Sequence, residues 1–380
     1  MAQSSGPDSQ REMLSPVTAR VREGDVVPGL LGLLDLVSFM AHDPHLVALQ
    51  IDAAGSVAEL QAAVTRIDAL VTALADGGLR VERIAHLAGA LNQRLFARLW
   101  GLVAPADLVA HSCLLVMGSE GRSEQLIKTD QDNALLLRDG FEQHPQGAQS
   151  AGRFNAALAG FGWPPCPGHI MLTNPLWRVG ETQFRDTLRK WVYGSDAQGP
   201  MHLAIFFDAV AVAGDARLLD AAREHLDRIL AGSDAFLARF AAAADQFDEP
   251  QRWWTRLSAH SVEPPLDLKK LGTFPIVHGV RALSLMHHVR ERGTAERLRR
   301  LVEARHLDAN LGRDLQDALH CLMGLKLRHQ LRQRAAGQAP DNLVQTSALG
   351  TMERDQLKSA LAIVKRFRAL LRGRLRLDAL

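Results

Sequence analysis

The residues with chemical potential are concentrated between Gly118 and Asn133, where the chain reads GSEGRSEQLIKTDQDN. Asp130 and Asp132 are two residues apart, so on an extended segment both carboxylates point to the same side. Two hard oxygen ligands side by side are suited to Mg²⁺. The spacing therefore predicts a metal site that could neutralise phosphate charge and orient an attacking oxygen.

Other residues of the same run suit a phosphate ligand. Gly118 and Gly121 lack side chains and would let backbone N–H groups approach a ligand closely. The hydroxyl of Ser119 can donate to a phosphate oxygen, and the planar guanidinium of Arg122 matches phosphate geometry. A helix that begins just after this turn would add its free N–H groups. The chain has neither Gly-Lys-Ser/Thr nor Gly-x-Gly-x-x-Gly, which excludes the common ATPase and dinucleotide-binding motifs.

A structural interpretation competes with each of these assignments. A lone Asp-x-Asp is more often a solvated turn than a metal site, but here apolar segments on both sides favour the functional interpretation. Arg122 could pair with Glu120 or Glu124, and Ser119 could simply cap a helix. Further along, the lysine pair at 269–270 could reach a phosphate, although a solvated pair is the more common outcome.

Apolar runs place the motif between two buried strands. Residues 113–117 (CLLVM) and 133–137 (NALLL) are short and continuously apolar, and the first run ends at a Gly-Ser turn. A third candidate strand is 168–172 (GHIML), in a stretch rich in Gly and Pro. Before these runs, Ser56 and Glu59 have capping-box spacing at the start of an amphipathic helix. A second amphipathic stripe follows, so the two helices should form a hairpin.

The rest of the sequence indicates a helical protein of ordinary composition. From about residue 201, apolar positions recur at helical spacing almost to the C-terminus. Lys and Arg number 44 against 42 Asp and Glu, and aromatic residues make up only 5%, which argues against a nucleic-acid partner. The 3 cysteines follow no metal-binding or disulfide pattern. Because neither a signal peptide nor a membrane-spanning run is evident, the sequence predicts a cytoplasmic protein with no membrane partner.

Together, these segments resemble a known superfamily. A strand, a Gly-Ser turn and a following Asp-x-Asp are similar to the DNA polymerase β-type nucleotidyltransferases. The longer string GSEGRSEQ…TDQDNALLL is most similar to the DUF294-type branch, which is related to the N-terminal domain of protein-PII uridylyltransferase. The resemblance continues through four later segments: 166–178 (CPGHIMLTNPLWR), 205–219 (IFFDAVAVAGDARLL), 266–285 and 340–361.

This resemblance implies a fold class and a division of the chain. The fold would be α+β and mostly α overall, with a small polymerase-β-like mixed sheet between a helical hairpin and a C-terminal helical bundle. Residues 1–50 would form a flexible or unassigned segment. Residues 51–200 would form the nucleotidyltransferase domain, with the hairpin at 56–101 and the catalytic α/β unit at 113–180. Residues 201–380 would form a helical substrate-binding domain.

The resemblance also implies an activity and roles for individual residues. The enzyme would transfer a nucleoside monophosphate from UTP or ATP to an acceptor hydroxyl and release pyrophosphate. In the uridylyltransferase relatives the acceptor is a tyrosine on a small regulatory protein. Asp130 and Asp132 would be catalytic and would hold Mg²⁺, with Mn²⁺ as an alternative. The residues expected to hold the nucleotide are Gly118, Ser119, Gly121 and Arg122.

The sequence departs from the superfamily pattern at the third carboxylate, which usually lies on a later strand. The candidate strand at 168–172 carries no acidic residue, and Asp208 and Asp186 are the candidate substitutes. A missing third acid would weaken the second metal site. The alternative function is therefore a catalytically degenerate signal-transduction protein that binds a nucleotide without turning it over.

Overall fold

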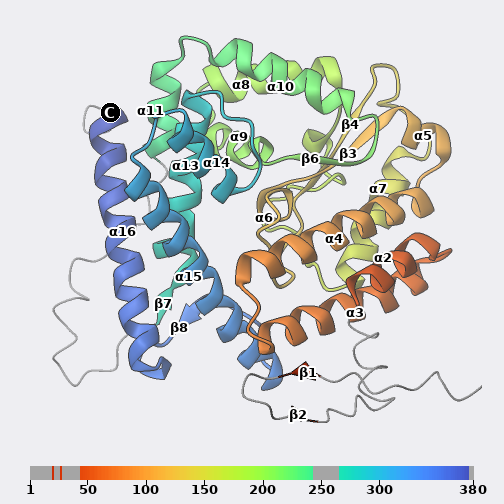
Figure 1. Ribbon diagram of the computed structural model, residues 1–380. Coiled ribbons are helices and arrows are strands. Elements are labelled where there is room, and N and C mark those ends of the chain that lie inside the picture. The colour runs from red at the N-terminus through yellow and green to blue at the C-terminus, as the bar shows by residue number, and fades with distance from the viewer. Residues whose placement is uncertain (1–18, 21–25, 28–42, 243–264, 376–380) are drawn as a thin grey trace, which may run out of the picture.

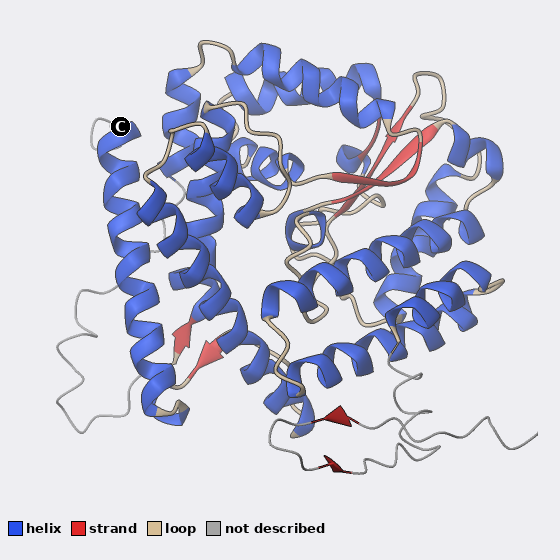
Figure 2. Cartoon of the chain, in the orientation of Figure 1, coloured by secondary structure: helices blue, strands red, loops and turns tan. Residues whose placement is uncertain are grey.

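The structure is a computed structural model that describes residues 19–20, 26–27, 43–242 and 265–375. Helices dominate it, and a small sheet lies among them (Figures 1 and 2). This confirms the predicted α+β class with a mostly helical content. Most of the N-terminal segment expected to be flexible or unassigned lies outside the described residues. Its described parts are the short strands β1 (Ala19–Arg20) and β2 (Val26–Val27) and the beginning of helix α2 (Pro44–Ala53).

The predicted helical hairpin is present. Helices α3 (Val57–Asp76) and α4 (Val81–Val103) lie side by side, with α2 packed against both (Figure 1). Ser56 is the N-cap of α3 and its hydroxyl accepts the N–H of Glu59 at 3.2 Å, while the Glu59 carboxylate accepts the N–H of Gly55 at 2.8 Å. These bonds satisfy amide groups that a helix start leaves unpaired. The capping-box spacing therefore identified the start of the hairpin correctly.

A four-stranded sheet with the order β5-β4-β3-β6 forms the centre of the next region. Strand β3 (Ser112–Val116) pairs antiparallel with both β4 (Asn133–Leu137) and β6 (Val210–Gly214), whereas β4 pairs parallel with β5 (Arg178–Gly180). The runs predicted at 113–117 and 133–137 are thus confirmed as strands. The sheet is mixed, as expected.

Helices cover both faces of this sheet. Alternate side chains of a strand point to opposite faces, and β3 follows that rule. Leu114 packs in the core shared with the hairpin and Leu115 in the core shared with the helical bundle. The helices around the sheet are α5 (Ala106–Ala110), α6 (Gly118–Gly121), α7 (Gly147–Gly160), η1 (Pro175–Trp177), α8 (Glu181–Tyr193), α9 (Gly199–Phe207) and α10 (Arg217–Leu230).

One expectation about the sheet was wrong. Residues 168–172 form a turn rather than a strand: His169 has a positive φ of 53°, and the N–H of Leu172 donates to the Asn133 side chain at 3.0 Å. The additional strands are instead β5 and β6. Because β6 lies beyond residue 200 and still pairs with β3, the sheet crosses the boundary predicted between residues 200 and 201.

The C-terminal part is a helical bundle that packs against the sheet region (Figure 1). Its long helix α15 lies along α16, and α13 is buried between neighbouring elements. In the described part of the chain, no helix is both long enough and apolar enough to cross a membrane. The elements are α11 (Asp234–Ala242), β7 (Leu266–Asp267), the π-helical turn η3 (Lys269–Thr273), α13 (Phe274–Met286), α14 (Thr294–Glu303), α15 (Ala309–Ala335), β8 (Leu343–Val344), η4 (Thr346–Ala348) and α16 (Thr351–Leu375).

Candidate functional site

A cavity of about 330 Å³ lies between the sheet region and the helical bundle, and we call it the central cavity. Helix α6, which follows β3, lies on the side of the sheet region that faces the bundle (Figure 1). The wall from the sheet region includes Gly118, Ser119, Asp130 and Asp132. The wall from the bundle includes Lys269, Arg281 and Lys326.

The turn after β3 requires a glycine at its first position. Gly118 has a φ of 58°, and a Cβ atom there would lie 2.5 Å from Oδ2 of Asp132. Only glycine combines this conformation with so close an approach to the carboxylate. No side chain caps α6, so the first N–H groups of this short helix are left for another acceptor. Ser119 also lines the cavity, where its hydroxyl donates to Oε1 of Gln125 at 2.8 Å.

Asp130 and Asp132 both face the central cavity, as their spacing predicted. Gln131 between them points the opposite way and is buried, and its side-chain amide donates to the carbonyl oxygens of Asn155 and Trp163 at 3.1 and 2.8 Å. The chain is therefore extended at this point, and the two carboxylates share one side.

Buried amide side chains hold the segment of Asp130 and Asp132 in place on the side away from the cavity. The Asn155 side chain donates to Gln131 at 2.6 Å and to Asn133 at 3.0 Å, and Asn133 also accepts the N–H of Leu172. All three amide side chains are buried, and such connected polar groups rigidify the backbone that they hold. Sequence reasoning missed this network. The alternation of polar residues in TDQDN was the one available signal, because it placed Gln131 and Asn133 on the face opposite the two acids.

The environment of Asp132 is unusual for a carboxylate. Burial and the neighbouring charge of Asp130 raise the pKa of Asp132 to about 6, while the positive charge of Lys269 opposes that shift. The thiol of Cys166 donates to Oδ1 of Asp132 at 3.4 Å. A bound cation would offset the repulsion that the charge of Asp130 exerts on the Asp132 carboxylate.

A divalent cation fits the side chains present. Ligand atoms of Asp130, Asp132 and Cys166 all lie within 4.8 Å of one another. Mg²⁺ is commonly bound through one or two carboxylates together with the phosphates of a substrate, so the two acids meet that need. The third group is a thiol, a softer ligand that Mg²⁺ does not favour, and burial next to Asp132 raises its pKa to about 11.

Asp208 was expected as a candidate third acid, and the structure contradicts this. Asp208 is fully buried and lies outside the group formed by the two cavity acids and Cys166. Its Oδ2 accepts from Arg122 at 2.5 Å and from Nε of Arg281 at 2.9 Å, and its Oδ1 accepts from Arg297 at 2.7 Å. Burial alone would raise the pKa of Asp208, but the three arginines outweigh it and hold the pKa well below its usual range. We call these four residues the arginine cluster.

The second candidate for the third acid, Asp186, is also excluded. It lies on α8 with an exposed side chain, and its nearest cation is Arg189 at 4.0 Å. Among the described residues, no third carboxylate joins Asp130 and Asp132.

Two residues predicted to hold the nucleotide have structural partners. Arg122 lines the central cavity, but its Nε donates to Glu124 at 2.6 Å and its Nη1 donates to Asp208. Arg122 therefore pairs with acidic side chains, as the structural interpretation of its role allowed. Gly121 does not line the cavity. Its N–H donates to Met117 at 3.0 Å, and a Cβ there would lie 2.1 Å from the carbonyl oxygen of Asp208, so this glycine serves packing.

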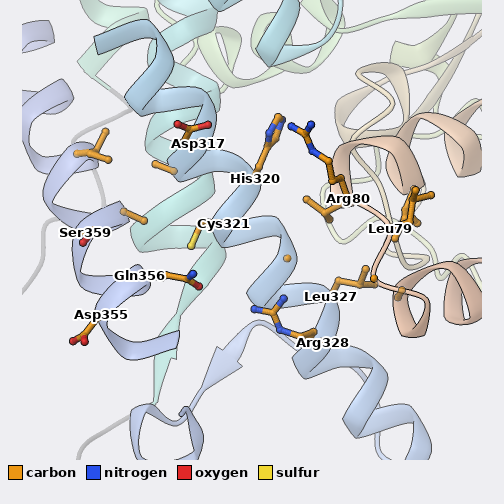
Figure 3. A pocket seen from close by; sticks show the side chains of 18 residues that line it. Leu79, Arg80, Asp317, His320, Cys321, Leu327, Arg328, Asp355, Gln356 and Ser359 are labelled. Atoms are coloured by element: carbon orange, nitrogen blue, oxygen red, sulfur yellow. The ribbon is translucent and has the colours of Figure 1, made fainter. Parts of the chain in front are cut away.

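A second and larger hollow, of about 630 Å³, opens between the turn of the helical hairpin and helices α15 and α16. Figure 3 shows Arg80 and His320 approaching it from opposite sides, with Cys321 and Gln356 deeper along the bundle. None of the residues predicted to do chemistry lines it. The central cavity is therefore the better candidate, although it is the smaller of the two.

Comparison with known proteins gives two matches. Residues 65–198 match the family model described as "Putative nucleotidyltransferase DUF294". Residues 234–375 match the family model described as "Putative nucleotidyltransferase substrate binding domain". No curated protein matches the chain. The first model contains the wall of the central cavity that bears the acids, and the second contains the wall that bears the lysines.

Proposed function

Because the chain belongs to the DUF294 family of putative nucleotidyltransferases, we propose that it is a Mg²⁺-dependent enzyme that transfers a nucleoside monophosphate from UTP or ATP to an acceptor hydroxyl. The observation that carries this proposal is the convergence of Asp130 and Asp132 in one cavity beside the uncapped turn at Gly118 and Ser119. Mn²⁺ could replace Mg²⁺, since it takes the same oxygen ligands.

In the proposed reaction, the acceptor oxygen forms a bond to the α-phosphorus of the nucleotide. The bond from that phosphorus to the oxygen bridging the α- and β-phosphates breaks, its electron pair leaves with pyrophosphate, and the hydroxyl proton passes to solvent. Asp130 and Asp132 would hold Mg²⁺, which would supply positive charge to the phosphates. The N–H groups of the turn at Gly118 would orient the phosphate chain, as uncapped amide groups do for anions.

The acceptor we propose is a hydroxyl on a small regulatory protein in the cytoplasm, by analogy with protein-PII uridylyltransferase. The family model over residues 234–375 is described as substrate binding, which supports a role for the bundle in presenting that acceptor. Neither a membrane nor a nucleic acid is part of this proposal.

The second candidate function is a degenerate nucleotide-binding signal-transduction protein. The specific observation in its favour is that the third ligand-type group beside the two acids is the thiol of Cys166 rather than a carboxylate. A protein of this kind would bind the nucleotide at the same place and change a partner contact without releasing pyrophosphate.

The test is to incubate the protein with each of the four labelled NTPs, Mg²⁺ and a cell lysate, and to measure label transfer and pyrophosphate release. The proposed enzyme transfers label, and Asp130→Asn and Asp132→Asn each reduce transfer by at least about a thousandfold, while their circular dichroism matches that of the wild type. Asp314→Asn, which alters an exposed ion pair on α15, is the matched control and keeps full activity. Nucleotide binding without pyrophosphate release favours the degenerate protein, and absence of both defeats the two proposals together.

A further inference from the structure

The bundle wall of the central cavity carries a cation that sequence reasoning did not single out. Leu319, Met323, Lys326 and Gln330 lie at steps of three and four on α15, so they share one face of that helix, and all four line the cavity. Lys326 thus occupies a place in a largely apolar stripe where a leucine would be the ordinary residue.

No acidic side chain forms an ion pair with Lys326 among the described residues, although the more distant charges of Asp267 and Asp130 act on it. Asp267, the acid of the bundle whose charge acts on Lys326, accepts the N–H groups of Lys269 and Lys270 at 2.9 and 3.0 Å and lies 3.8 Å from the ammonium group of Lys270. Burial first, and then the positive charge of Lys269, lower the pKa of Lys326 to about 8. A partly buried ammonium group with a like charge beside it costs folding free energy unless an anion arrives to offset it.

Lys269 is an exposed residue of the same cavity wall. Its side chain makes no ion pair among the described residues, and it lines the central cavity from η3. Its charge affects the pKa of Asp132 on one side and that of Lys326 on the other. Lys269 therefore lies within electrostatic range of both walls of the cavity.

The arginines of the same cavity add positive charge, and the acids that they contact are already paired. Arg122 and Arg281 line the same cavity and belong to the arginine cluster, in which Arg122, Arg281 and Arg297 face only the carboxylates of Asp208 and Glu124. The bundle side of the central cavity is therefore a cationic surface, whereas the opposite wall holds the two metal-binding acids.

We propose that Lys326 and Lys269 bind the β- and γ-phosphates of the nucleoside triphosphate, so that the helical bundle holds the part of the substrate that leaves as pyrophosphate. This inference rests on the proposed function, and it names the residues that would distinguish a triphosphate from a monophosphate. The competing structural interpretation is a pair of solvated lysines. It does not account for the position of Lys326 inside an apolar stripe that faces a cavity.

The experiment measures the binding of pyrophosphate, UTP, ATP, UMP and AMP to the full chain by calorimetry in the presence of Mg²⁺. Lys326→Gln and Lys269→Gln are each expected to weaken pyrophosphate and triphosphate binding by at least about tenfold, since each removes a charge-assisted contact, and to leave monophosphate binding within about twofold. Lys326→Arg, which keeps the charge, is expected to recover most of the affinity.

Lys270→Gln is the matched control, because Lys270 is adjacent in sequence and does not line the cavity. It should leave all five affinities unchanged. Equal pyrophosphate binding by wild type and Lys326→Gln would overturn the inference and leave the proposed function standing. If the wild type binds neither pyrophosphate nor any triphosphate, the proposed function itself fails.

Discussion

Acidic residues lie at two places between the sheet region and the helical bundle, and their surroundings differ in burial and in paired charge. In the arginine cluster, Asp208 is fully buried and accepts hydrogen bonds from three guanidinium groups. In the central cavity, Asp130 and Asp132 are partly exposed, and burial together with the charge of Asp130 raises the pKa of Asp132 despite the opposing charge of Lys269.

This difference indicates that the arginine cluster stabilises the fold, whereas the central cavity is suited to binding a ligand. The cluster joins segments from both family models through bonds that are complete within the protein. The cavity leaves charge uncompensated on both walls, with acids on one side and lysines on the other. Because uncompensated buried charge costs stability, it persists most readily where a ligand of the opposite sign binds. The free energy of unfolding puts the acids of both groups on one scale.

The largest effect is expected for Asp208→Asn. Removal of this carboxylate charge would leave three arginine side chains buried without their partner, which should lower the free energy of unfolding by about 3–5 kcal/mol. Urea denaturation at pH 7 measures this loss. Asp314→Asn is the control, since Asp314 pairs with Arg366 at an exposed site and its loss should cost less than about 0.5 kcal/mol. Similar values for both variants would mean that the cluster does not hold the two regions together.

Glu120 lies between these two cases, because it is buried like Asp208 but its hydrogen-bond partners are neutral. Its side chain accepts from Asn92 at 2.9 Å and from Trp163 at 3.4 Å, and burial raises its pKa to about 8. A raised pKa in the folded state means that stability is present in full below the unfolded pKa, near 4.5, and is lost as the pH rises towards 8.

Glu120→Gln removes this titration. Relative to wild type, the variant should gain about 4 kcal/mol in the free energy of unfolding between pH 4.5 and 8, with a plateau at higher pH. Urea denaturation across that range, with Asp314→Asn as a variant that leaves Glu120 intact, measures the gain. A constant difference at every pH would show that Glu120 is ionised in the folded protein.

A smaller gain is expected for Asp132→Asn, opposite in sign to the loss at Asp208. Because the pKa of Asp132 is raised to about 6, its ionised form costs stability that is absent below about pH 4 and complete above pH 6. The variant should therefore be more stable than wild type by about 3 kcal/mol at pH 8 and equal to it at pH 4. Thermal unfolding without metal measures this difference, and added Mg²⁺ should stabilise the wild type alone. A destabilised variant would place Asp132 with the structural acids.

The local part of this architecture could be predicted from the sequence. Strands β3 and β4 are continuous apolar runs, and the Ser56–Glu59 spacing marks the start of the hairpin, because each of these signals depends on neighbouring residues only. The short strand β5 and the alternating VAVAG of β6 were missed, since the first has three residues and the second lies in a region that is otherwise helical. With β5 and β6 missed, the third strand was wrongly placed at 168–172.

The site could be predicted only in part. The spacing of Asp130 and Asp132 is a local signal, and the structure places both side chains in the central cavity. The partners of Asp208 lie 86, 73 and 89 residues away along the chain, so no local pattern could have paired them with it. The role of Lys326 could not be predicted, because a single lysine in a helix gives no signal until the fold shows which face of the helix it occupies.

The smallest effect is expected for Cys166→Ser, which tests the thiol that lies beside Asp130 and Asp132. Because burial raises the pKa of Cys166 to about 11, the thiol keeps its proton at neutral pH and acts as a donor to Asp132. A hydroxyl can make the same bond, so the free energy of unfolding should change by less than about 1 kcal/mol and Mg²⁺-dependent transfer should stay within about threefold of wild type. Absorption spectra with Co²⁺ provide a second measurement, since a protonated thiol gives no sulfur-to-cobalt charge-transfer band. A band that disappears in Cys166→Ser would instead make Cys166 a metal ligand and would favour a softer cation than Mg²⁺ at this site.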